Sequence, residues 1–227
     1  MRHAVRALVS GDPRARLGCD DLEGATFDEA QAALAKTHGW DPEAPRGAID
    51  PDATLTALRA AAARLHDAAA ARARIAVATS RPASLLGLDQ WVASDAAARG
   101  ATLLGADRAS VDGPARRELW WVGDVAVVTD GTALLADDGE AAPDDWLFAV
   151  GRPDLVVADR GFAGAALAAG IEVIAWVDLD APALALAATR GLPILVVPLD
   201  TQRPAGAYDA AIVAFAAVAG PGEASGR

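Results

Sequence analysis

The chain has 227 residues, of which 53% are hydrophobic, enough for one large domain or for a core with a small appendage. Its net charge of -11 and isoelectric point near 4.6 argue against nucleic acid and anionic membranes as partners, because both attract Lys and Arg. The single cysteine, Cys19, excludes an internal disulfide, and the sequence lacks an uncharged apolar run of about 18 residues, so a cytoplasmic protein is expected.

Residues 1–73 are predicted to form a helical segment that packs on the core. Thr26 and Glu29 have the T-x-x-E spacing of a capping box, and apolar residues follow them at helical spacing. His38 and His66 lie near predicted helix ends, where a cation suits the helix dipole. We therefore expect both histidines to be surface or dipole-complementing residues rather than ligands.

The segment IDPDATL (49–55) contains the letters of the D-x-D-x-T nucleophile motif of haloacid-dehalogenase-type phosphatases. That chemistry needs the first Asp at the end of a buried strand, and the preceding Pro45 and Gly47 would break such a strand. Asp50 followed by Pro51 is typical of a helix start, with Asp as the cap and Pro in the first turn. The segment is therefore interpreted as a helix start.

Residues 74–220 are predicted to form a three-layer, Rossmann-like α/β core with a mostly parallel sheet, because strands alternate with helices there. RIAVAT (74–79) is the first clear strand, and a helix follows from Pro82 to about Gly100. The final residues, 221–227, are predicted to form a disordered tail.

A small antiparallel meander is predicted over residues 118–136. Gly123-Asp124 and Asp130-Gly131 are two-residue hairpin signals between short apolar runs. Trp120 and Trp121 point to opposite faces of a strand, so we expect one in the core and the other half exposed. Asp130 is interpreted as a turn residue rather than a metal ligand.

The main functional signal lies in residues 155–180, which are predicted to form a strand, a turn, a short helix and a second strand. Asp159 follows the first apolar run, and Asp178 and Asp180 follow the second. Ligands of open parallel sheets bind outside the carboxyl ends of the strands, so these three acids are expected to converge at one edge. The alternative for Asp159 is a helix-capping carboxylate.

Three polar residues at the end of the RIAVAT strand are predicted to bind phosphate: Thr79, which is its last residue, and Ser80 and Arg81, which follow it. Free N–H groups at a helix start and a bidentate guanidinium both suit phosphate oxygens. The alternative is that Ser80 only caps the helix and Arg81 is solvated. Gly161, which together with Gly164 is predicted to let the backbone turn after the strand, is the fourth predicted substrate-binding residue.

Several segments of the chain together resemble a bacterial family of phosphatases that is common in actinomycetes. The segments are GDPRARLG, TFDEAQA, ATSRPASLL (78–86), WWVGDVAVVTDGTALL (120–135), PDLVVADRGFAGAALAAGIEVIAWVDLDAPALALAATRG (153–191) and VVPLDTQRPAGAY (196–208). Family members read closer to ATGHP at residues 78–82 and closer to ADVNDPAL at 177–184. Arg81 in place of His keeps a cation but loses a general acid, because Arg stays protonated. Relatives also carry an upstream polar helix that this chain lacks, since it starts at Met1 close to the GD segment. If that helix contributes ligands, an altered or lost activity is expected.

The leading interpretation is a phosphatase that hydrolyses a small phosphomonoester with a divalent metal at the carboxyl edge of the sheet. Asp159, Asp178 and Asp180 are the predicted ligands of Mg²⁺, which prefers oxygen ligands, and the first two are the predicted catalytic residues. The alternatives are a non-catalytic protein that binds a phosphate ligand or nucleotide, and a lyase or cyclase acting on a small carboxylic acid. The expected partner is a small-molecule phosphate ester, and a homodimer stays open.

Overall fold

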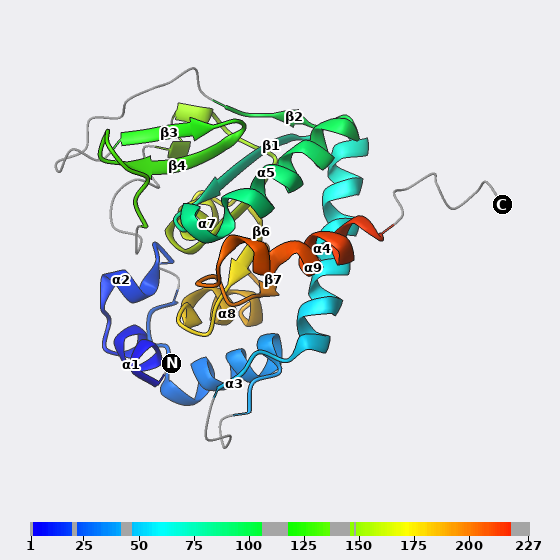
Figure 1. The fold of residues 1–227 in the computed structure, drawn as a ribbon. Coiled ribbons are helices and arrows are strands. Elements are labelled where there is room, and N and C mark those ends of the chain that lie inside the picture. The colour runs from blue at the N-terminus through cyan, green and yellow to red at the C-terminus, as the bar shows by residue number, and fades with distance from the viewer. Residues whose placement is uncertain are drawn as a thin grey trace.

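The computed structural model describes residues 2–19, 22–41, 47–105, 118–136, 146–147 and 149–218. A seven-stranded sheet forms the centre, in the order β3-β4-β1-β5-β6-β7, with β2 also paired to β1 (Figure 1). The strands are β1 (Arg74–Thr79), β2 (Thr102–Leu103), β3 (Glu118–Val122), β4 (Val125–Thr129), β5 (Leu155–Asp159), β6 (Glu172–Val177) and β7 (Ile194–Pro198). Every pair is parallel except β3 with β4, so the predicted mostly parallel α/β sheet is confirmed.

Helices cover both faces of the sheet, which gives the predicted layers. The helices are α1 (Arg2–Val9), α2 (Pro13–Arg16), α3 (Phe27–His38), α4 (Pro51–Ala70), α5 (Pro82–Ala98), α7 (Arg160–Ala168), α8 (Pro182–Thr189), the short η2 (Ala205–Tyr208) and α9 (Asp209–Ala216). Alternate residues of β1 enter different cores: Ile75 and Val77 pack with α4, α5 and α9, whereas Ala76 and Ala78 pack with α7 and α8. Strands buried on both faces read as continuous apolar runs, which is why these runs were easy to identify.

The N-terminal helices α1, α2 and α3 lie together beside α8 (Figure 1) and share its core. Gly164 of α7 lets the N-terminal segment approach closely, because a Cβ at this position would lie 1.5 Å from the carbonyl oxygen of Leu17. The prediction that Gly161 and Gly164 make the turn into α7 is wrong. The left-handed residue is Arg160, with φ of 41°, and Gly161 is the second residue of the helix.

The helix starts predicted from capping residues are confirmed. Thr26 and Glu29 form a reciprocal capping box on α3. The Asp50 carboxylate accepts the backbone N–H of Asp52 at 3.0 Å, so the D-x-D-x-T letters are the N-terminus of α4.

The expectation that the two helix-end histidines lie at the surface is wrong, because both are buried. His38 is 0% exposed, and its Nε2 donates to the carbonyl oxygen of Val177 at 3.0 Å. Burial lowers the pKa of His38 to about 4, so its ring is neutral. His66, 1% exposed, lies with its Nε2 2.9 Å from the Asp95 carboxylate. His38 is covered because α3 packs on α8, and His66 is covered because α4 packs on α9.

The predicted meander is shorter than expected. β3 and β4 form the expected hairpin, but the third run makes only one bridge, from Thr129 to Leu134. The Asp130 carboxylate accepts the backbone N–H groups of Thr132 and Ala133, both at 2.8 Å. These bonds hold the chain in a turn where the third strand was predicted. These bonds also lower the pKa of Asp130 to about 2 and confirm it as a turn residue.

Trp120 is 43% exposed and Trp121 packs against the core, as the alternation along β3 predicted. In the described part of the chain, no helix is long and apolar enough to cross a membrane. The predicted C-terminal tail lies outside the described residues.

Candidate functional site

The direction in which the chain adds strands to the sheet reverses between β1 and β5. From β1 the chain crosses by way of α5 to β4 on one side, whereas from β5 it crosses by way of α7 to β6 and then β7 on the other. The two crossover helices therefore cover opposite faces, and the chain leaves the carboxyl ends of β1 and β5 toward opposite faces at a topological switch point. Ligands of open α/β sheets bind at such a point, which here lies between Thr79 and Asp159.

Asp159 joins these two strand ends. It is 0% exposed, and its Oδ1 accepts the backbone N–H of Ser80 at 2.7 Å, while Oδ2 accepts a longer bond, 3.4 Å, from Thr79 Oγ1. In the described structure the carboxylate makes no capping bond to α7, and Arg81 rather than Ser80 occupies the cap position of α5. Asp159 occupies the N-cap position of α7, but its carboxylate bonds Ser80 instead of the helix, so the alternative of a helix-capping carboxylate is wrong. The alternative in which Ser80 caps α5 is also wrong.

The pKa of Asp159 reflects two opposing effects, burial and nearby hydrogen-bond donors and cations. Burial raises the pKa of Asp159, and the N–H and hydroxyl of Ser80 together with Arg160 and Arg81 lower it, with a net rise. The Ser80 side chain is itself buried, and its Oγ lies near enough to Asp159 to lower that pKa without making a well-formed hydrogen bond to any described residue. A buried hydroxyl of this kind is a donor that a ligand oxygen would satisfy.

Asp180 lies between two arginines. Arg160 Nη1 donates to Asp180 Oδ1 at 2.8 Å, and Arg81 Nη2 lies 4.0 Å from Oδ2. The amide of Gln202 donates to the same Oδ2 at 3.3 Å. The two arginines come from the ends of β1 and β5, so the switch point carries two cations and a shared carboxylate. Arg160 was missed from the sequence, although it directly follows the strand-end Asp159.

Asp178 ties the end of β6 to the loop after β7. Its Oδ1 accepts the N–H of Leu179 at 2.6 Å, and its Oδ2 accepts the N–H of Thr201 at 3.2 Å. Burial raises the pKa of Asp178, and the nearby charges of Asp180 and Asp200 add to the rise. The three acids on these loops therefore repel one another, a charge arrangement that a cation would relieve.

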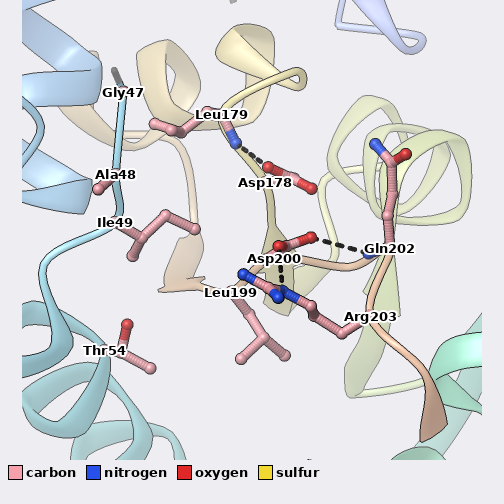
Figure 2. A pocket seen from close by; sticks show the side chains of 10 residues that line it. All are labelled: Gly47, Ala48, Ile49, Thr54, Asp178, Leu179, Leu199, Asp200, Gln202 and Arg203. Atoms are coloured by element: carbon pink, nitrogen blue, oxygen red, sulfur yellow. Dashed lines mark hydrogen bonds and ion pairs between the residues drawn. The ribbon is translucent and has the colours of Figure 1, made fainter. Parts of the chain in front are cut away.

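A cavity of about 720 Å³ opens beside Asp178, beyond the ends of β6 and β7. Figure 2 shows Asp178, Asp200, Gln202 and Arg203 on one side and Gly47 to Ile49 on the other. The full lining is Gly47, Ala48, Ile49, Thr54, Asp178, Leu179, Leu199, Asp200, Gln202 and Arg203. Arg203 Nε donates to Asp200 Oδ2 at 2.6 Å. Because Gln202 lines the cavity and also donates to Asp180, the cavity adjoins the arginine pair.

The predicted metal ligands do not gather into one cage. Within the described ranges, no group of three or more His, Cys, Asp or Glu side chains is placed to hold a metal ion. Asp159 accepts the Ser80 N–H, and Asp180 is paired with Arg160. Asp178 is the member of the predicted trio that lines the cavity. A metal in this arrangement would have one or two protein carboxylates and would take its remaining ligands from substrate and water.

A second fully buried acid besides Asp159 lies close to the site without any sequence signal. Asp89 of α5 is 0% exposed, and its Oδ1 accepts the indole N–H of Trp176 at 2.7 Å. Burial raises the pKa of Asp89 well above its usual range, and the charge of Asp159 adds to the rise. Burial therefore favours the neutral form of the Asp89 carboxyl. A single Asp in an apolar helical pattern gives no indication of such a contact.

Comparison with known proteins gives two matches. A family model described as Phosphatase matches residues 2–215. The chain is also 36% identical over 209 residues to Phosphatase SCO2771 of Streptomyces coelicolor, a match that covers 86% of this chain and 78% of that protein. The family match spans both strand ends of the switch point and the cavity beside them.

Proposed function

The chain belongs to the phosphatase family, and we propose that it hydrolyses a small phosphomonoester at the carboxyl edge of its sheet. The reaction is the transfer of a phosphoryl group from an alcohol oxygen to water, with the alcohol and inorganic phosphate as products. The observation that carries the proposal is the placement of Arg81 and Arg160 from two strand ends around one carboxylate. Two guanidinium groups at this spacing suit a doubly charged phosphate.

The phosphate oxygens would be bound by three groups of the switch point. Arg81 and Arg160 offset the charge that develops on the phosphoryl oxygens, and the Ser80 hydroxyl donates to a third oxygen. Asp159 positions this turn, because its buried carboxylate holds the Ser80 N–H at 2.7 Å. The alcohol part of the substrate would lie in the adjoining cavity, which is large enough for a sugar-sized group.

Mg²⁺ is the proposed cofactor, held by Asp178. When bound, the metal would supply charge neutralisation and an activated water. The raised pKa of Asp178 and the nearby charges of Asp180 and Asp200 support a cation at this position. Asp159 and Asp180 would reach the metal only by leaving the partners that they have here.

A panel of phosphate esters, assayed with Mg²⁺ and with EDTA, tests the proposal. We expect turnover that EDTA abolishes and Mg²⁺ restores, and we expect Asp178→Asn to lower kcat/KM by about 100-fold or more. Asp154→Asn at the opposite edge removes the same charge and is the matched control, with activity unchanged. Metal-dependent turnover that survives Asp178→Asn would place the metal elsewhere, and no turnover of any ester would refute the proposed hydrolysis.

One observation favours a second candidate, a protein that binds a phosphate ligand without hydrolysing it. Asp159 is fully buried and already bonded to the protein backbone, so it cannot reach a substrate as it stands. The arginine pair could then bind phosphate without Asp159 acting on the phosphoester bond. Tight phosphate binding together with absent turnover would select this candidate.

A further inference from the structure

We propose that Asp180 is an internal competitor for phosphate: its carboxylate occupies the position in which Arg81 and Arg160 bind a phosphate, and the ligand binds by displacing it. This inference rests on the proposed function, because it takes the two arginines as phosphate ligands. Donors from three separate segments converge on this one carboxylate: the end of β1, the start of α7 and the loop after β7. Such convergence is the geometry of an anion site.

The carboxylate fills this site incompletely. Arg160 makes a full hydrogen bond to it at 2.8 Å, whereas Arg81 Nη2 remains 4.0 Å away. The buried Ser80 Oγ makes no well-formed hydrogen bond within the described residues. A carboxylate has only two oxygens, whereas phosphate has more oxygens and a higher charge. One phosphate has enough oxygens to accept from both arginines and from the serine at once.

Asp180 is also able to leave. It lies in the turn between β6 and α8, and its side chain is 34% exposed, whereas Arg160 and Arg81 are only 10% and 17% exposed. A partly exposed carboxylate is readily solvated when it swings into water, so displacing it costs little. Asp159, at 0% exposure on the same edge, has no such freedom.

The consequence is selectivity by charge. A monoanion such as acetate gains no more from the arginines than Asp180 does, so it would not displace the resident carboxylate. A phosphate dianion gains more, because its attraction to two cations is larger. Asp180 would therefore hold the two arginines in place in the free protein, exclude small carboxylates and weaken the binding of the inorganic phosphate product.

Calorimetric titration with inorganic phosphate tests the proposal without requiring turnover. We expect Asp180→Asn to tighten the phosphate Kd by about tenfold, the size of effect typical of one charge-assisted hydrogen bond. Asp180→Glu keeps a competing carboxylate and should stay within about twofold of the wild type. Asp200→Asn removes an equal charge from the same edge without touching either arginine, and it should tighten the Kd by less than about threefold. Acetate should bind measurably only to Asp180→Asn.

The outcomes separate this proposal from the proposed function. Unchanged phosphate affinity in Asp180→Asn, equal gains in Asp180→Asn and Asp200→Asn, or no phosphate binding by any variant would overturn the competitor role. Tighter binding in Asp180→Asn by a protein that hydrolyses no ester would support the competitor role and refute the hydrolysis. A thermal unfolding curve for each variant confirms that the titrated protein is folded.

Discussion

The two edges of the sheet carry the same kinds of ion pair in opposite settings. At the amino edge, Arg74 and Asp154 pair across β1 and β5, with both side chains 50% exposed. At the carboxyl edge of these same strands, Asp159 is 0% exposed beside Arg160. The strands thus have arginine and aspartate near both ends, but Arg74 bonds Asp154 directly, whereas the buried Asp159 accepts the Ser80 N–H and Arg160 pairs with Asp180.

The pKa values show what burial changes. Hydrogen bonds from Arg74 lower the pKa of Asp154, the usual result for an exposed ion pair. The pKa of Asp159 is raised although two arginines lower it, because burial outweighs both of them. Pairing dominates at the amino edge, where it holds the strands together. Desolvation dominates at the carboxyl edge, where it raises the pKa values of Asp159 and of Asp178, which lines the cavity. Perturbed acids of this kind mark functional sites.

Removing the acid from each edge should give the largest contrast. Asp159→Ala leaves the buried Ser80 N–H without its acceptor and removes a negative charge near Arg81 and Arg160, so we expect a loss of about 4 kcal/mol in the free energy of unfolding and no detectable activity. Asp154→Ala breaks only an exposed pair and should change both much less. Urea unfolding and an ester assay measure the two effects. Similar losses from the two variants would show that burial does not distinguish the edges.

The carboxyl edge also depends on the close contact beneath α7. Gly164→Ala would place a Cβ 1.5 Å from the Leu17 carbonyl oxygen, so we expect a loss of about 3 kcal/mol and lower activity, because α7 begins at Arg160. Gly87 of α5 is the matched helical glycine, with nothing near its Cβ position. Gly87→Ala should stabilise the protein by about 0.5–1 kcal/mol. Chemical denaturation of both variants tests this, and a neutral Gly164→Ala would contradict the close packing.

His38 connects α3 to the carboxyl end of β6 and should make that contact sensitive to acid. Its pKa falls from 6.5 to about 4 on folding, so below pH 6.5 the unfolded state binds more protons than the folded state. Stability should therefore fall as the pH drops from 6.5 to about 4, by up to about 3 kcal/mol. His38→Gln keeps a donor for Val177 and lacks this titration. Parallel stability profiles for the wild type and this variant would refute the assignment.

The sequence predicted the fold well because its evidence is local. Strands such as RIAVAT are buried on both faces and read as apolar runs, and the caps at Thr26 and Asp50 fix helix starts within a few residues. The prediction of a third strand in the meander was wrong for a local reason as well. The Asp130 carboxylate accepts the N–H groups of Thr132 and Ala133, which a strand would have used.

The site was only partly predictable because its contacts are long-range. Asp159 and Ser80 meet across 79 positions, and His38 and Val177 across 139, so no spacing rule connects them. Arg160 could have been noticed as the residue after a strand-end acid. Asp89 could not, because its burial against Trp176 depends on how α5 packs on the sheet.

The central claim is that the carboxyl edge binds phosphate and the amino edge does not. Arg160→Gln and Arg74→Gln test it directly, since each removes the arginine of one ion pair: Arg160 with Asp180 at the carboxyl edge, and Arg74 with Asp154 at the amino edge. With a hydrolysed phosphate ester, we expect Arg160→Gln to lower kcat/KM by about 100-fold and Arg74→Gln to leave it within about twofold. Equal effects of the two variants, or full activity in Arg160→Gln, would contradict the account.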